Sequence, residues 1–131
     1  MNKLTPEQLV LLNRKLVAEE EFADSKINFN LLKEITEIPY EKNKELFYVH
    51  KTAIQKATIL GILIANRQPF EKANQETAVL ALLTLLDING YKVINYGKDI
   101  EALCGYLIES NKEDTYKWIH AHLVNEGYME Q

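Results

Sequence analysis

Residues 57–90 read ATILGILIANRQPFEKANQETAVLALLTLLDING, which is two apolar runs separated by the polar loop Arg67–Asn74. In the first run the apolar residues recur at spacings of three and four, which is typical of a helix. In the second run, Ala78–Ile88, they cover nearly the whole circumference, and a helix that is apolar all round lies in the middle of its domain. Gly61 costs about 1 kcal/mol relative to alanine inside a helix, so we expect two helices to approach closely there. The stretch predicts an all-α fold built around a central apolar helix pair.

The rest of the chain also shows helical periodicity, and residues 1–131 are expected to form a single domain. The sequence Thr5-Pro6-Glu7-Gln8 predicts a capped first helix, with Thr5 as N-cap and Gln8 as its capping-box partner. Glu19–Glu21 is interpreted as the solvated end of that helix, and Ile38–Lys44 as an exposed loop or short flap. The expected helices cover about 5–20, 29–36, 46–66, 75–89, 98–110 and 114–125.

Composition excludes several classes of protein. Fifteen Lys and Arg against nineteen Asp and Glu give a net charge of −4, which argues against a nucleic-acid partner. A single cysteine, Cys104, excludes an internal disulfide and a Cys-rich zinc site, and we expect a buried thiol. The N-terminus lacks a hydrophobic signal region, and the apolar runs are shorter than the ~20 residues that span a bilayer. We therefore expect a cytoplasmic protein with no membrane partner.

The loop sequence 68–78, QPFEKANQETA, resembles the signature of the Fic/Doc (Fido) family, H-x-F-x-[D/E]-[G/A]-N-[K/G]-R-[T]. Glu45–Phe47 ahead of the loop and the apolar helix after it fit the same family, so the resemblance covers essentially the entire chain. The Ala73-Asn74 pair is closer to Doc, the death-on-curing toxin of bacterial or phage toxin–antitoxin modules. The resemblance implies a Fic/Doc-like helical bundle and a transferase that uses ATP and Mg²⁺ on a protein hydroxyl, as an AMP-transferase (Fic) or a kinase (Doc).

In that family the motif histidine is the general base, the acidic residue holds Mg²⁺, and the asparagine, loop amides and basic residues bind phosphate. Here Gln68 occupies the histidine position, and a carboxamide cannot take up a proton near neutral pH. Lys72 occupies the acidic position, where a cation repels Mg²⁺. Gln75 and Glu76 stand in place of the Lys-Arg pair. The residues that shape the loop remain: Phe70, which anchors it to the core, Ala73 and Asn74.

The substitutions also suggest how the loop is stabilised without a ligand. With Asn74 as N-cap, Glu76 lies in the first helical turn, where a negative charge complements the helix dipole by ~0.3–1 kcal/mol. Lys72 and Arg67 leave weak anion or nucleotide binding without catalysis as an alternative, and a solvated loop whose cations pair with Glu71 and Glu76 is favoured over it.

The favoured hypothesis is therefore a degenerate Doc-like protein without transferase activity, a pseudoenzyme that acts as a protein-binding or toxin–antitoxin-related regulatory module. Its partner would be an antitoxin-like or target protein that binds the flap and loop surface, with no cofactor and no metal. The alternative is an active kinase or AMP-transferase with a diverged site that uses ATP and Mg²⁺.

His50, expected early in the long helix, is a candidate replacement base, with a surface histidine as the plainer interpretation. His120 and His122 lie two apart on a predicted helix and face different directions. The oligomeric state stays open.

Overall fold

The computed structural model describes residues 2–96, 99–109 and 112–130, with side chains for all of these except 20, 22, 109 and 112–117. Its fold is all-α, as predicted, and within the described ranges β pairing is limited to isolated bridges. In chain order the elements are α1 (Pro6–Leu16), α2 (Glu19–Asp24), α3 (Phe29–Glu37), the 3₁₀ helix η1 (Ile38–Tyr40), α4 (Ala53–Arg67), α5 (Asn74–Ile88), α6 (Ile100–Glu109) and α7 (Lys112–Asn125). No helix in these ranges has the length and apolar character needed to cross a membrane.

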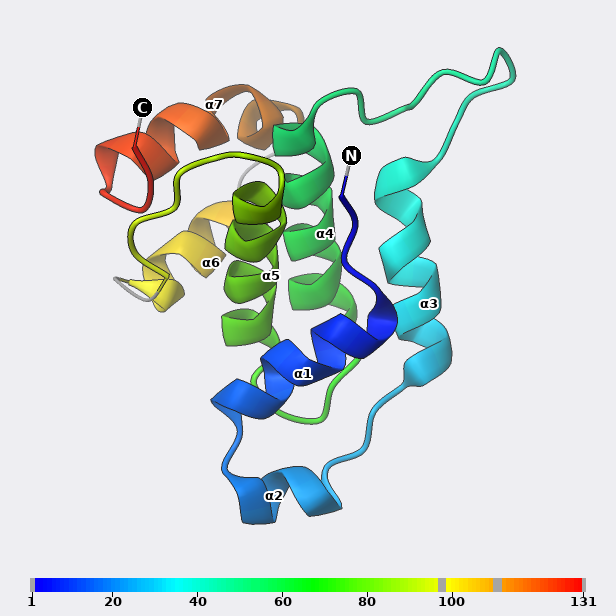
Figure 1. Ribbon diagram of the computed structural model, residues 1–131, viewed down its shortest axis with the longest axis vertical. Helices are drawn as coiled ribbons and strands as arrows, with labels where there is room; N and C mark the ends of the chain where they lie inside the picture. Colours follow the sequence, from blue (N-terminus) through cyan, green and yellow to red (C-terminus); the bar gives the residue numbers. More distant parts are fainter. Residues whose placement is uncertain (1, 97–98, 110–111, 131) are drawn as a thin grey trace.

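Helices α4 and α5 lie side by side at the centre, with α1, α3, α6 and α7 packed around them and α2 apart at the lower end (Figure 1). From Ala57 to Ala65 every residue of α4 is buried. A Cβ placed on Gly61 would lie 3.3 Å from the carbonyl oxygen of Ala78 and 3.4 Å from side chains of Leu82 and Leu107. The glycine therefore permits the close approach of α4 to α5 and α6, as its position in the sequence predicted.

Helix α1 begins as predicted but ends earlier. Thr5 and Gln8 form the capping box, in which the backbone N–H of Gln8 donates to Thr5 Oγ1 and that of Thr5 donates to Gln8 Oε1. The predicted end near residue 20 is wrong, because Val17 is buried with extended backbone and turns the chain after Leu16. The acidic run that was expected to close α1 instead opens α2.

The largest difference from the predicted helices lies at residues 41–51, here called the arm. The expectation of a helix from residue 46 is wrong, because α4 begins only at Ala53, where Thr52 and Gln55 form a second capping box. The flap expected at 38–44 is also only partly correct, since residues 38–40 form η1 and Pro39 is buried. The arm is a hairpin that projects from the helices at the upper right of Figure 1.

Side-chain hydrogen bonds explain why the arm is not helical. Asn43 Oδ1 accepts from the backbone N–H groups of Glu45 and Phe47, and Phe47 O accepts from the N–H of Asn43. An asparagine that bonds nearby backbone groups in this way competes with helix formation. The apolar residues 46–49 therefore continue a turn rather than a helix.

The C-terminal part agrees with the predicted pattern. Gly90 follows α5 with a left-handed φ of 94°, while Asn89 itself keeps a negative φ. The final helices α6 and α7 occupy the predicted regions, and the ends expected at 98 and 110 lie outside the described residues. Cys104 is buried, as expected.

Candidate functional site: the loop between α4 and α5

The loop Gln68–Ala73 has a left-handed residue at each end. Gln68 ends α4 with φ 51° and its N–H donates to the Ile64 carbonyl, so its side chain lies exposed at the helix C-terminus. Ala73 precedes α5 with φ 59°. A left-handed backbone costs an L-residue roughly 1–2 kcal/mol, so contacts elsewhere in the loop must offset both positions.

Phe70 and Asn74 supply one set of these contacts. Phe70 is buried, at 4% exposure, which confirms its role as an anchor to the core. The Asn74 side chain reaches back to it: Oδ1 accepts from the Phe70 N–H at 3.0 Å and Nδ2 donates to the Phe70 carbonyl at 2.7 Å. The prediction of Asn74 as N-cap is therefore wrong. Ala73 holds that position, and Asn74 is the first helical residue, whose amide closes the loop on itself.

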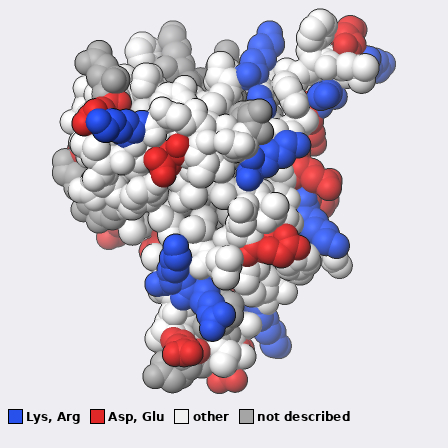
Figure 2. Space-filling view, viewed as in Figure 1, with Lys and Arg blue, Asp and Glu red and all other residues white. Residues whose placement is uncertain are grey.

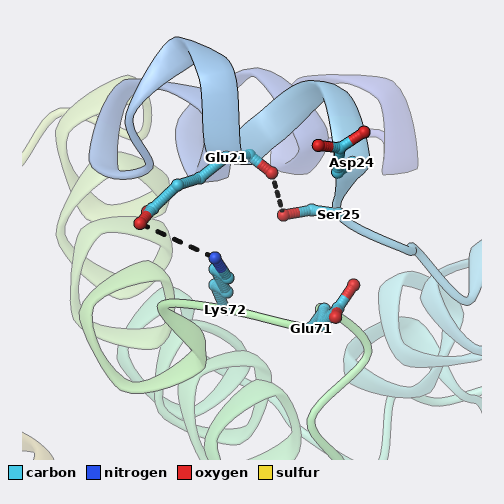
Figure 3. A pocket seen from close by; sticks show the side chains of 5 residues that line it. All are labelled: Glu21, Asp24, Ser25, Glu71 and Lys72. Carbon is cyan, nitrogen blue, oxygen red and sulfur yellow. Dashed lines mark hydrogen bonds and ion pairs between the residues drawn. The ribbon is translucent and has the colours of Figure 1, made fainter.

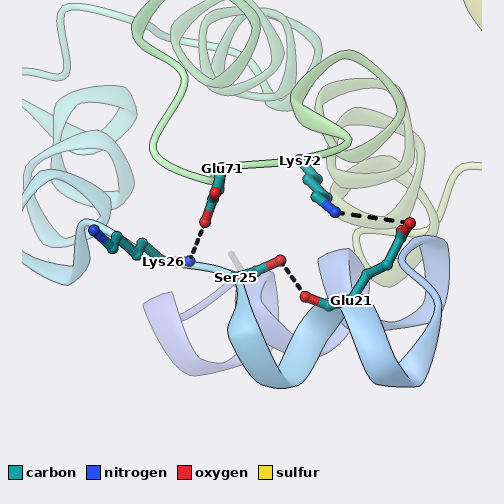
Figure 4. Close-up of polar contacts among 5 residues, drawn as sticks. All are labelled: Glu21, Ser25, Lys26, Glu71 and Lys72. Atoms are coloured by element: carbon teal, nitrogen blue, oxygen red, sulfur yellow. Dashed lines mark hydrogen bonds and ion pairs between the residues drawn. The ribbon is translucent and has the colours of Figure 1, made fainter.

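Residues 26–28, between α2 and α3, pair with the outer side of the loop. The Asn28 N–H donates to the Pro69 carbonyl at 2.9 Å, and the Glu71 N–H donates to the Lys26 carbonyl at 3.1 Å. The Glu71 carboxylate in turn accepts from the Lys26 N–H at 2.7 Å (Figure 4). Residues 26–28 therefore bond the carbonyl of Pro69 and the N–H of Glu71, and this segment was not associated with the loop by the sequence pattern.

Asn13, a residue of α1, holds the loop from the inner side. It is 1% exposed, and its Nδ2 donates to the Lys72 carbonyl at 2.9 Å and to Thr77 Oγ1 at 3.0 Å. Thr77 Oγ1 donates to the Ala73 carbonyl at 2.6 Å. The sequence offered one sign of this network, because Asn13 is a polar residue on the apolar face of α1 and buried amides are normally hydrogen-bonded.

The charges around the loop are predominantly negative. Lys72 Nζ lies 3.7 Å from Glu21 Oε1 of α2, so the expected pairing of Lys72 with Glu71 and Glu76 is wrong. Figure 3 shows this ion pair at the hollow of about 320 Å³ between α2 and the loop, which Asp24, Ser25 and Glu71 also line. Three carboxylates and one ammonium group surround the hollow.

The first turn of α5 carries Gln75, exposed, and Glu76, half-buried. Glu76 stands in the first helical turn, as predicted, where its charge complements the helix dipole. Burial raises the pKa of the Cys104 thiol, and the charge of Glu76 raises it further. Arg67 ends α4 and is exposed.

His50 and the arm are far from the loop. His50 lies in the arm before α4, whereas the loop follows the C-terminus of the same helix. Fifteen residues of α-helix rise about 22 Å. The arm, which contains His50, and the loop therefore lie at opposite ends of α4, as Figure 1 shows for the two segments. His50 is therefore too far away to act as a base at the loop, and residues 38–44 do not share a surface with it; the segment beside the loop is α2 with residues 25–28.

The other two histidines have separate neighbours. The His122 ring stacks on Tyr106 at a centroid distance of 4.0 Å, and the His120 ring meets Tyr91 edge-on at 5.8 Å. Within the described part of the chain, no group of three or more His, Cys, Asp or Glu residues is arranged to hold a metal ion.

Comparison of the chain with protein-family models, with curated proteins and with solved structures found no match.

Proposed function

We propose that this chain is a degenerate Doc-like member of the Fic/Doc family that lacks transferase activity and acts by binding protein. The observation that carries the proposal is the loop 68–73, which is held by hydrogen bonds and an ion pair from other parts of the chain. Residues 26–28 bond its outer side, Asn13 bonds its inner side, and Glu21 pairs with Lys72.

The residues at this loop do not fit a magnesium–nucleotide complex. The ammonium group of Lys72 stands where the family places a magnesium ligand, and Glu71 and Glu21 already occupy its surroundings. Glu76 in the first turn of α5 adds a negative charge at the helix end where phosphate would bind. At ~4 Å such a charge opposes a phosphate by about 1–4 kcal/mol. The exposed amide of Gln68 offers no group that can act as a base near neutral pH.

Protein binding is favoured over catalysis by the surface of the arm. Four consecutive apolar side chains, residues 46–49, are 39–76% exposed. A contiguous exposed apolar segment is typical of an interaction site. Figure 2 shows Lys, Arg, Asp and Glu side chains interspersed over the face in view, so no strongly basic face competes as a recognition surface there.

The direct test is incubation of the purified chain with cell lysate and ATP labelled in either the α- or the γ-phosphate. We expect no labelled protein above a reaction without the chain. Labelling that depends on the chain and is lost in a Gln68→Ala variant would contradict the proposal. Expression of the unaltered chain is also expected to leave cell growth unchanged, unlike an active toxin of this family.

A restoration variant separates lost chemistry from lost shape. Gln68→His, Lys72→Asp, Gln75→Lys and Glu76→Arg together return the family's reactive groups to the loop. Adding Glu21→Gln removes the carboxylate that would otherwise face the new Asp at residue 72. Nucleotide binding by this variant indicates that only the reactive groups differ. If it folds and binds no nucleotide, the shape of the loop or of the flap has also diverged from that of the family.

A further inference from the structure

The end of α5 carries the dipeptide Asn89-Gly90, and the side chain of Asn89 is bonded there to the segment that precedes α1. We propose that Asn89 is a site of spontaneous deamidation, which its contacts with Asn2 slow in the folded chain. The modification in turn releases the segment 2–5 from the end of α5. This proposal does not depend on the proposed function.

An asparagine that precedes a glycine is chemically labile, because glycine has no side chain to hinder attack by its backbone nitrogen. In the reaction, the Gly90 nitrogen gives its proton to solvent and forms a bond to Cγ of Asn89, and the side-chain nitrogen leaves as ammonia. Water then opens the cyclic imide at either carbonyl, which leaves aspartate or isoaspartate at position 89. Every other asparagine of the chain is followed by a residue with a larger side chain. Asn89 is therefore the asparagine of this sequence that is most prone to the reaction.

Hydrogen bonds hold both reacting groups in the folded chain. The Gly90 N–H donates to the Asp87 carbonyl at 3.1 Å. The Asn89 amide donates through Nδ2 to the Leu85 carbonyl at 2.7 Å and to the Asn2 carbonyl at 2.9 Å, and its Oδ1 accepts from the Asn2 N–H at 2.9 Å. The Gly90 nitrogen can attack only after these bonds break. Deamidation therefore requires local opening of the end of α5, to which solvent has access because Gly90 is exposed.

Asn2 is the residue that couples this end of α5 to the start of the chain. Besides its two backbone bonds to the Asn89 amide, its Nδ2 donates to the Ile88 carbonyl at 2.8 Å, a group that has no partner within a helix that ends at Ile88. Leu4, which is 6% exposed, anchors the same segment to the core. The rate of deamidation at Asn89 should therefore depend on how firmly residues 2–5 are held.

The product of the reaction cannot restore these contacts. A carboxylate at position 89 has no hydrogen to donate, so the carbonyl oxygens of Asn2 and Leu85 lose their donor and face a negative charge instead. In isoaspartate the backbone also runs through the former side chain, which lengthens the chain at the helix end. The modification is therefore irreversible, and it favours the state in which residues 2–5 are detached.

The first test follows deamidation of the full chain at neutral pH by peptide mapping with mass spectrometry that separates asparagine, aspartate and isoaspartate. We expect the reaction at Asn89 ahead of the other asparagines, and more slowly in the folded chain than in urea. Leu4→Ala is expected to speed it about fivefold or more relative to Leu12→Ala, because it loosens the segment that holds the amide. Leu12 is the matched control, since it is a buried leucine of α1 at 9% exposure. Equal rates in the folded chain and in urea would overturn the proposal, and so would equal acceleration by the two variants, which is the result expected if the reaction needs global unfolding.

The second test examines the product and does not depend on the leucine variants. Asn89→Asp places the carboxylate directly, and trypsin is expected to cut after the exposed Lys3 about fivefold faster or more than in the original chain. The control is Asn30→Asp, which makes the same charge change on the exposed surface of α3 and should leave this cleavage rate unchanged. Equal cleavage rates after Lys3 in the two variants would show that the Asn89 amide does not hold the segment, and would overturn the proposal.

Discussion

The buried amide of Asn13 provides a quantitative test of how the loop is held. The change Asn13→Ala removes donors to the Lys72 carbonyl at 2.9 Å and to Thr77 Oγ1 at 3.0 Å. Each net hydrogen bond contributes about 1 kcal/mol, and the site is 1% exposed, so the lost packing adds to the cost. We expect a loss of about 2–3 kcal/mol in the free energy of unfolding, although alanine has the higher helix propensity.

Urea denaturation followed by circular dichroism measures this loss. With a slope of roughly 1–3 kcal/mol per molar urea, the midpoint should fall by about 1 M. Hydrogen exchange should also quicken at the amides of residues 70–77, which the Asn13 network holds. The control is Asn30→Ala on the exposed surface of α3, with an expected change within about 0.5 kcal/mol. If Asn13→Ala and Asn30→Ala shift the midpoint equally, the reasoning about the inner side of the loop is refuted.

Three further predictions concern the core. Gly61→Val should lower the free energy of unfolding by about 1–3 kcal/mol, because even a single Cβ lies 3.3 Å from the Ala78 carbonyl; an unchanged urea midpoint would contradict the packing of α4 on α5. Burial, with a smaller contribution from Tyr48, raises the pKa of Tyr40 to about 12, so stability should fall between pH 10 and 12 as the unfolded chain releases this proton first. Tyr40→Phe should reduce that fall in stability. It also removes a buried hydroxyl that has no hydrogen-bond partner among the described residues. The variant should therefore be more stable at pH 7 by about 1 kcal/mol, as measured by denaturant unfolding. Burial and the charge of Glu76 raise the pKa of Cys104, so its thiol should react with a disulfide reagent only as fast as the protein opens; rapid reaction in the native state would place it at the surface.

Features specified by a few neighbouring residues were predictable from the sequence. The Thr5–Gln8 capping box lies within one helical turn. The apolar runs of α4 and α5 are long enough to specify helices whatever their neighbours in the fold are. Gly61 stood out because glycine is unfavourable within a helix. Phe70 was predicted as an anchor because an apolar residue in a polar loop needs a buried site, and it has one.

Features that depend on distant residues, or on which of several local hydrogen bonds forms, were not predictable. A helix would also explain the apolar character of residues 46–49. The hairpin forms instead because the backbone N–H groups of Glu45 and Phe47 donate to Asn43 Oδ1. Lys72 has acidic neighbours in the sequence, yet its partner is Glu21, about fifty residues earlier in the chain. Asn74 is a favourable N-cap by residue type, but the left-handed Ala73 displaces it by one position and directs its amide to Phe70.

As proposed above, the loop between α4 and α5 keeps its shape through contacts within the chain and lacks the groups with which the Fic/Doc family binds a nucleotide. Titration of the ¹⁵N-labelled chain with ATP and Mg²⁺, followed by NMR at the amides of residues 68–77, tests this most directly. We predict no saturable shift at these amides. Saturable shifts that require Mg²⁺ and centre on residues 70–76 would contradict the claim.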